Sequence, residues 1–383
     1  VEHGETVIEF ADLEPIVDLT GGTLTVNATN AANAIDYTSG TLPDSGLVSV
    51  DGFETIEFTS KTSLTINALA GSDEINLAGV NTSLTGITVN AGDPADGSDT
   101  LIVESAPGTT DVLTVVPSAQ GAGAVEHSAA GPADIDYTGV EDIELVGQVA
   151  DVEGFAVEGT TGDDLFEYFS GLTLDQGSVE GVMMLDVLGS TFTLPTITFS
   201  GMHPLATRTF NDGAAGGEDD FFFPGTFSDD EITYDGAGGL TNANDGTTIV
   251  VIQLGDSTTG VVIEGKDGDD TIDVTPEDGV SVIVRGGNNS PGSDELIYRA
   301  AGTVTVELSN HDIEDAGSAG TRDASWAGIE RLTIDGNGEE AILEGTADDD
   351  SVDVVPRGPS EVRATVGGSQ TVFDFVDVDG FTV

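Results

Sequence analysis

The sequence predicts an all-β protein, and more specifically a parallel β-solenoid, or β-helix, whose turns are rich in Gly and Asp. Three observations lead to this prediction. Short β-type stretches recur along the chain, Gly-Asp turns separate them, and the turns repeat at a nearly constant interval. Asp73 and Asp99 are 26 residues apart, and Asp270 and Asp294 are 24 apart. A period near 20 to 26 residues is typical of one coil of a repeat architecture.

Short runs of Val, Ile, Leu and Thr supply the strands. They alternate or are rich in β-branched residues, as half-buried strands are. The expected strands include residues 48–50, 55–58, 63–66, 86–89, 249–252, 281–284 and 303–308. No stretch keeps a helical period over three turns, so no helix is expected.

Acidic turns precede many of these strands. Five have the form Gly-x-Asp and a sixth is degenerate; they lie at residues 71–75, 97–101, 162–166, 268–272, 292–296 and 347–352. Glycine permits a sharp turn, and the carboxylate offers the hard oxygen that calcium prefers. Residues 89–103 also align with 284–298 without a gap. The chain therefore contains true internal repeats.

Longer recurrences suggest a division of the chain. The motif Gly-apolar-Glu recurs at residues 52–54, 139–141 and 328–330. The expected parts are a partial N-terminal repeat (1–51), a repeat unit (52–138), a repeat unit with an irregular insertion (139–240), a repeat unit (241–327) and a partial C-terminal repeat (328–383). The chain starts at Val1 and ends in what looks like another repeat, so we expect a mature product or a fragment. The alternative architecture is a string of tandem calcium-binding β-sandwich domains.

Charge restricts the possible partners. The chain carries 70 acidic and 9 basic residues, a net charge of -61. Such self-repulsion opposes compaction unless cations bind or screen it, and it excludes nucleic acid and anionic membranes as partners. A merely solvated, salt-adapted surface would explain the bulk charge but not the glycine spacing. The chain has no Cys and no apolar run of about 18 residues, so we expect neither disulfides nor membrane insertion.

Two segments carry a family resemblance, residues 264–273 and 159–166. They resemble the hemolysin-type (RTX) calcium-binding repeats of secreted bacterial proteins, and the chain more loosely resembles β-solenoid surface adhesins. The family repeats Gly-Gly-x-Gly-x-Asp-x-apolar-x in tandem, whereas the copies here are isolated. The resemblance implies Ca²⁺ as the bound ion.

The expected calcium ligands are carboxylates and amides of the acidic turns. They are Asp73, Asp93, Asp96, Asp99, Asp163, Asp164, Asp267, Asp269, Asp270, Asn288, Asp294, Asp348 and Asp350. Loop carbonyls would complete the six to eight oxygens that calcium takes. The alternative is that each Asp only caps its own turn backbone.

No catalytic signature is present. The four histidines, His3, His127, His203 and His311, are far apart and are expected at the surface or in turns. Paired carboxylates are too common in this chain to identify a glycosidase. We therefore expect no enzyme.

The expected function is an extracellular, calcium-stabilised structural or adhesive repeat protein of a bacterial surface, such as a filament or surface-layer subunit. It would associate with itself, end to end or laterally, or with other surface proteins and glycans. One alternative is a phage tail-fibre or carbohydrate-binding adhesin module that contacts its target through residues 210–227. A second alternative, which is less favoured, is a polysaccharide-degrading β-helix enzyme.

Overall fold

The structure is all-β. This computed structural model describes residues 2–3, 6–7, 16–79, 83–92, 98–105, 108, 110–148, 154–170, 176–185, 190–202, 207–211, 218–244, 247–256, 258–287, 293–317 and 324–383. Every regular element among them is a β-strand, which confirms the all-β prediction and the expected strand segments. In these ranges no helix has the length and apolar character needed to cross a membrane.

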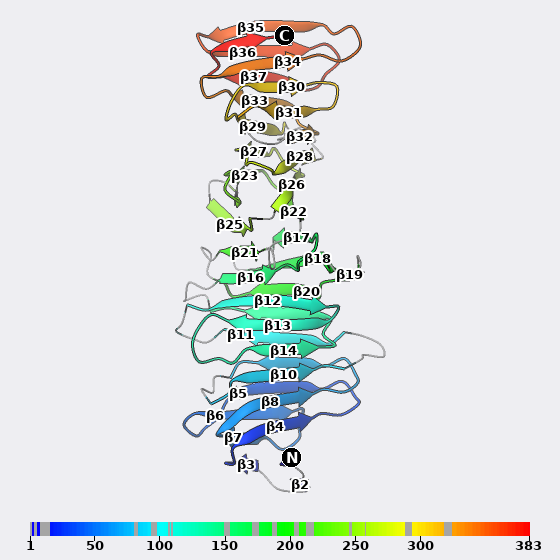
Figure 1. Cartoon of the computed structure of the whole chain (residues 1–383), viewed down its shortest axis with the longest axis vertical. Helices are drawn as coiled ribbons and strands as arrows, with labels where there is room; N and C mark the ends of the chain where they lie inside the picture. The colour runs from blue at the N-terminus through cyan, green and yellow to red at the C-terminus, as the bar shows by residue number, and fades with distance from the viewer. Residues whose placement is uncertain are drawn as a thin grey trace. The chain divides into compact units, whose positions relative to one another are not determined.

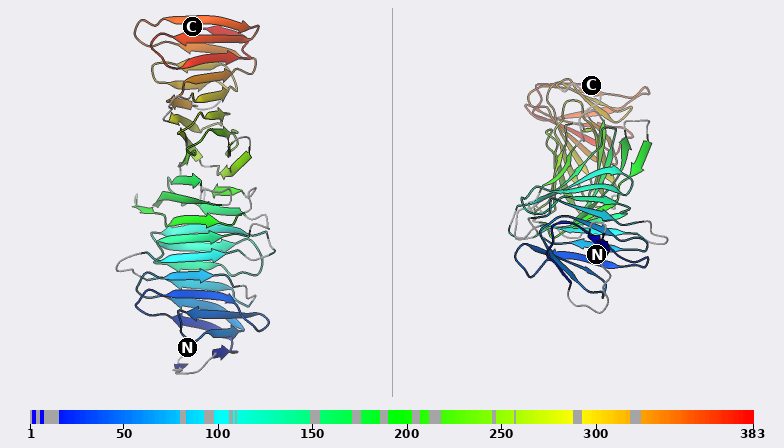
Figure 2. Two further views of the ribbon diagram at one scale, coloured as in Figure 1. Left: turned by 180° about the vertical axis from the view of Figure 1, so that it is seen from behind. Right: turned by 60° about the horizontal axis from the view of Figure 1, so that its bottom comes forward.

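The chain divides into two compact units. Unit 1 comprises residues 1–162 and 171–214, and unit 2 comprises 163–170 and 215–383. Each unit contains two large sheets, whose strands stack in a ladder (Figures 1 and 2). The repeat boundaries predicted from the sequence stay predictions.

Unit 1 contains sheets 1a and 1b. Sheet 1a has the order β4 (Gly22–Asn27), β8 (Lys61–Asn67), β10 (Gly86–Asn90), β14 (Ile135–Thr138), β13 (Ala122–His127), β12 (Val112–Ala119), β16 (Gly154–Glu158), β21 (Arg208–Asn211). Sheet 1b has the order β3 (Ile16–Asp18), β7 (Ile56–Thr59), β6 (Ser45–Val50), β5 (Ala34–Ser39), β9 (Glu74–Leu77), β11 (Thr100–Glu104), β15 (Asp142–Val146), β20 (Thr196–Ser200), β18 (Gly177–Leu185), β19 (Ser190–Thr193). β1 (Glu2–His3) and β2 (Thr6–Val7) form an antiparallel pair.

Unit 2 contains sheets 2a and 2b. Sheet 2a has the order β25 (Thr247–Leu254), β24 (Gly239–Asn244), β23 (Asp230–Tyr234), β27 (Thr271–Val274), β29 (Glu295–Arg299), β33 (Arg331–Asp335), β37 (Val372–Val376), β36 (Glu361–Val366), β35 (Val352–Gly358). Sheet 2b has the order β17 (Leu165–Ser170), β22 (Asp219–Pro224), β26 (Thr258–Lys266), β28 (Ser281–Gly287), β32 (Ala324–Ala327), β31 (Asp312–Asp315), β30 (Val304–Glu307), β34 (Glu340–Glu344), β38 (Gly380–Thr382).

Within each unit the chain alternates between its two sheets. β8, β9, β10 and β11 fall in sheets 1a, 1b, 1a and 1b, and neighbours within a sheet run parallel. At several points one strand is replaced by an antiparallel three-stranded meander, as in β12–β13–β14 and β35–β36–β37. Turn residues that are hydrogen-bonded to one another in neighbouring coils are therefore 24 or 26 residues apart in sequence where no meander lies between them. Where a meander intervenes, they are 36 to 42 residues apart. The uniform period predicted from the sequence is wrong wherever a meander is inserted.

The core lies between the two sheets of each unit. Leu24, Leu64 and Ile87 pair in register across sheet 1a, and all three are buried. From the facing sheets of unit 1, the rings of Phe155 and Phe199 stack with centroids 4.7 Å apart. Each fully buried aliphatic or aromatic side chain contributes about 1.5–3 kcal/mol. In unit 2, the rings of Phe375 and Phe381 also meet between the two sheets, with centroids 4.6 Å apart and planes tilted by 51°.

The aromatic segment proposed as a contact surface is largely core. Phe210 is buried in unit 1, and Phe221 and Phe223 are buried in unit 2. Phe222 is half-buried, and Phe227 is 76% exposed with its ring under the Lys266 ammonium at 5.3 Å. Most of the aromatic side chains described in this segment are therefore core, and the adhesin contact there stays a prediction.

Candidate functional site: two ladders of carboxylates

A row of carboxylate and amide side chains forms a ladder at the turns that lead into sheet 1b of unit 1; Asn33, Asp73 and Asp99 are buried, whereas Glu141 is exposed. Asn33, Asp73, Asp99 and Glu141 stand immediately before β5, β9, β11 and β15. The backbone N–H of each residue donates to the side-chain carboxylate of the next, and each N···O distance is 2.8 Å. Because these residues are 40, 26 and 42 apart in sequence, the contacts depend on the parallel register.

Unit 2 repeats this arrangement at the turns that lead into sheet 2a. The residues are Asp230, Asp270, Asp294 and Glu330, and the N–H-to-carboxylate distances are 2.8, 2.9 and 2.9 Å. We call these two rows the inner ladders. One more rung, from Asp164 N–H to Asp219 Oδ1 at 2.9 Å, occurs in the same unit between β17 and β22.

Each inner carboxylate extends the backbone ladder by one residue. The first regular backbone hydrogen bond between these two turns runs from Thr100 N–H to the Asp73 carbonyl, at 2.8 Å. One residue earlier, the Asp99 carboxylate stands where a backbone carbonyl would stand and accepts the Asp73 N–H. Because a buried N–H without a partner is costly, this charge-assisted bond braces the stacked turns.

The inner ladder is electrostatically strained. Asp73 and Asp270 are at most 2% exposed, and among the described residues the Oδ2 of each has no hydrogen-bond partner. Burial is the main cause that raises the pKa of Asp73, and neighbouring carboxylates add to it. Burial likewise raises the pKa of Asp270 to about 7, with the charges of Asp294 and Asp230 adding to the effect. Neutralisation would therefore stabilise this row.

The carboxylate geometry explains one recurring glycine. A Cβ atom at Gly225 would lie 2.8 Å from Asp230 Oδ2, and one at Gly265 would approach Asp270 Oδ2 more closely still. Both glycines precede their aspartate by five residues, and neither has a left-handed backbone. Glycine is required there because a side chain would displace the ladder carboxylate.

A second row of carboxylates lies one residue earlier and faces solvent. The Asp229 carboxylate accepts the Asp269 N–H at 2.9 Å, and the Asp269 carboxylate accepts the Ser293 N–H at 3.2 Å. Asp163 likewise accepts the Glu218 N–H at 3.0 Å. In this outer ladder the later turn donates to the earlier one, which is the reverse of the inner ladder. The successive turns of unit 2 that Asp229, Asp269 and Asp163 connect are therefore bonded in both directions.

The predicted calcium ligands fall into several groups. Asp73, Asp99, Asp164, Asp270 and Asp294 are buried and donate or accept in the inner contacts, whereas Asp163 and Asp269 belong to the outer ladder. Asp267 and Asp348 are exposed in turns. Asp350 accepts from Thr346 N–H at 2.6 Å, which fits a carboxylate capping its own loop. Asp93, Asp96 and Asn288 lie outside the described residues.

The inner ladder does not fit a calcium cage. Calcium takes six to eight oxygens that converge on one point. Here the carboxylates lie in a row, and each spends one oxygen on a backbone N–H. Across the described ranges no group of three or more His, Cys, Asp or Glu side chains is placed to hold a metal ion. Exposed carboxylates such as Asp269 would have to supply any calcium site in these ranges.

Sequence reasoning missed several ladder members, namely Asn33, Glu141, Asp219, Asp229, Asp230 and Glu330. A signal for four of them existed, and for Asn33 it is Thr29, four residues earlier, whose N–H donates to Asn33 Oδ1 at 2.9 Å. Glu141 and Glu330 stand in the recurring Gly-apolar-Glu motif. Asp230 follows Thr226 by four residues, and Thr226 N–H donates to it at 2.6 Å, just as Thr346 donates to Asp350.

His127 differs from its expected place at the surface. Its side chain is 4% exposed, and Nδ1 lies 2.6 Å from Asp111 Oδ2. Burial alone would raise the pKa of Asp111, but the bonds from His127 and from Ala129 N–H lower it below its usual range. Ser128 Oγ also contacts Asp111, at 3.3 Å. The histidine and the hydroxyl of the exposed Ser128 both contact the carboxylate, which is the arrangement of a partly buried polar cluster.

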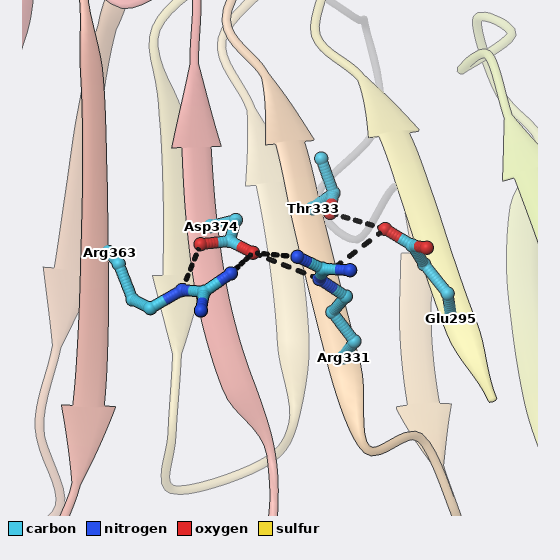
Figure 3. A network of polar contacts seen from close by, with 5 residues as sticks. All are labelled: Glu295, Arg331, Thr333, Arg363 and Asp374. Atoms are coloured by element: carbon cyan, nitrogen blue, oxygen red, sulfur yellow. Dashed lines mark hydrogen bonds and ion pairs between the residues drawn. The ribbon is translucent and has the colours of Figure 1, made fainter. Parts of the chain in front are cut away.

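A separate polar network lies on the outer face of sheet 2a (Figure 3). Arg363 holds Asp374 with two bonds of 2.6 Å, from Nε to Oδ1 and from Nη2 to Oδ2. Arg331 contacts Asp374 Oδ2 through Nε and Nη2, both at 2.9 Å. Burial opposes ionisation of Asp374, but the two arginines hold its pKa below the usual range. Glu295 accepts from Thr333 Oγ1 at 2.7 Å and lies 3.8 Å from Arg331 Nε.

No protein-family model and no curated protein matches the chain.

Proposed function

We propose that the chain is a structural or adhesive repeat segment of an extracellular bacterial surface protein, built as a two-sheet parallel β-solenoid. The observation that carries the proposal is the continuity of the inner ladders. A backbone-to-carboxylate bond at 2.8–2.9 Å joins each turn to the next, over three successive steps in each unit. Such bonds make every turn depend on its neighbours, which suits a stacked, load-bearing architecture.

The strand order supports a solenoid over a string of β-sandwiches. Sandwich sheets of the immunoglobulin type are antiparallel. Here the chain passes to the other sheet between strands that pair in parallel. For example, β10 pairs in parallel with both β8 and β14, and neither is its neighbour in sequence. Antiparallel pairing occurs within the meanders and hairpins. One coil of the solenoid would contain one strand of each sheet, or a meander in place of one of these strands.

The proposed mechanism is mechanical rather than catalytic. Stacked turns bring like charges into rows, and a net charge of -61 opposes their assembly. Calcium is proposed as the counter-ion, bound at exposed carboxylates such as Asp163 and Asp269. Because calcium is abundant outside cells, an ion-dependent fold would be most stable there. Proposed partners are further copies of the chain, or other surface proteins and glycans.

A calcium titration after chelation tests this function. Circular dichroism and thermal melting would be followed at constant ionic strength, with magnesium and sodium as controls. We expect a saturable increase in melting temperature that is specific for calcium. An equal response to sodium would show that the acidic turns are general salt adaptation, and the calcium proposal would be abandoned.

A further inference from the structure

A surface hollow at the end of sheet 2a collects a large share of the basic side chains of this acidic protein. It encloses about 340 Å³, and its lining includes Arg331, Arg357 and Arg363. The whole chain contains only 9 Lys and Arg residues. Three guanidinium groups around one concavity therefore distinguish this face from the acidic remainder.

The three arginines retain unused donors. In this network, Arg331 and Arg363 contact Asp374 through Nε and Nη2, so Nη1 of each is not engaged there (Figure 3). Arg357 is exposed on β35, and among the described residues its side chain makes neither an ion pair nor a hydrogen bond. A ligand could therefore be bound without breaking the network.

The network fixes the positions of two of these groups. Arg363 and Asp374 pair in register on β36 and β37, and Thr333 pairs with Asp374 on β33. The bidentate contact from Arg363 to Asp374 holds one guanidinium plane, and Asp374 in turn holds Arg331. Preorganised guanidinium groups lose less conformational entropy on binding, and their planar fork matches a carboxylate.

We propose that this hollow binds a single carboxylate group carried by a compact molecule, such as one sugar acid. Arg357 and the free Nη1 groups of Arg331 and Arg363 supply the donors. Three acidic residues, Glu295, Glu361 and Asp374, also line the hollow, so its formal charge is balanced before the ligand enters. A volume near 340 Å³ lies at the lower end of the range for small-molecule pockets, about 300–1,000 Å³.

The charge of the chain limits the ligand to a small anion. A polyanion would extend over the surrounding acidic surface and be repelled. A monocarboxylate concentrates its charge within reach of the arginines, while more distant charges are screened beyond about 8 Å at physiological salt. The inference is independent of the proposed structural function, because it concerns one face of unit 2 and requires no calcium.

Isothermal titration calorimetry of the full chain with D-glucuronate tests the site, with D-glucose as the uncharged comparison. We expect saturable binding of glucuronate alone. Arg357→Gln should weaken it about tenfold, since one charge-assisted hydrogen-bonding group is lost. Glu361→Gln should strengthen it, because a competing carboxylate at the rim is removed. Arg357 makes no described contact, so the variant should keep the wild-type melting temperature.

Arg285→Gln is the matched control. Arg285 is an exposed arginine on β28 of sheet 2b, and it does not line the hollow. This variant should bind glucuronate as the wild type does. The proposal is overturned if glucuronate shows no saturable binding, if glucose binds equally well, or if Arg357→Gln and Arg285→Gln change the affinity alike.

Discussion

Replacing Asp270 by Asn should stabilise the protein at neutral and alkaline pH. Asparagine keeps the Oδ1 that accepts the Asp230 N–H at 2.8 Å, and it removes the charge on a side chain that is 1% exposed. Burial, with added repulsion from Asp294 and Asp230, raises the pKa of Asp270 from 3.8 to about 7. A tenfold change in proton affinity corresponds to about 1.4 kcal/mol, so ionising Asp270 lowers the free energy of unfolding by on the order of 4 kcal/mol.

The sign of the pH dependence follows from the direction of this change. Well below pH 3.8 the carboxyl is protonated in both states, and the two proteins should be equally stable. As the pH rises from about 4 to 7, the unfolded chain releases this proton first, so the wild type loses stability relative to the variant. Above pH 7 the folded form is also ionised, and the difference should level off.

Urea denaturation measured by tryptophan fluorescence provides the assay. Trp326 is the only tryptophan of the chain, it is 4% exposed, and it lies in the same unit as Asp270. The titration should be run in chelator so that metal ions do not contribute. Asp267→Asn, an exposed change in the same turn, should leave the pH profile unaltered. An Asp270→Asn protein that is less stable than the wild type at pH 8 would refute the idea of a strained ladder.

Two further outcomes follow from the same geometry. Gly265→Ala should lower the free energy of unfolding by about 2 kcal/mol or more, because the new Cβ would collide with the Asp270 carboxylate; Gly86→Ala, which meets nothing within 4 Å, should change urea denaturation little. Asp269→Asn should reduce the calcium-dependent rise in melting temperature, since it removes an exposed outer-ladder charge; an unchanged calcium response would exclude that residue as a ligand.

The parts of the fold that could be predicted are those with local causes. Alternation and β-branched content identify strands such as β8 and β28, because one face of each is buried. The aligned segments 89–103 and 284–298 also adopt equivalent structures. Gly92 and Gly287 both have a left-handed backbone, with φ of 119° and 115°, and a Cβ at either would strike the carbonyl of the preceding turn. Glycine is therefore dictated at both places by the stacking.

The parts that could not be predicted depend on register. The first aligned segment runs from sheet 1a into sheet 1b, and the second runs from sheet 2b into sheet 2a. Asp99 and Asp294 therefore occupy the same kind of turn on different sheets. Asn33 and Glu141 belong to the same ladder as Asp99, although neither stands in a Gly-x-Asp motif. Only the pairing of distant turns shows that they share one role.

The ladders also explain why a turn sequence suggests calcium binding so readily. Both a calcium site and a backbone brace need a glycine that permits a tight turn and a carboxylate at its end, so the motif alone cannot separate them. The structure separates them by exposure. An ion at Asp270 would have to reach a carboxylate that is 1% exposed and already bonded through one oxygen, whereas Asp269 is exposed to hydrated ions. Protons should therefore relieve the inner ladder, and cations should act on the outer one.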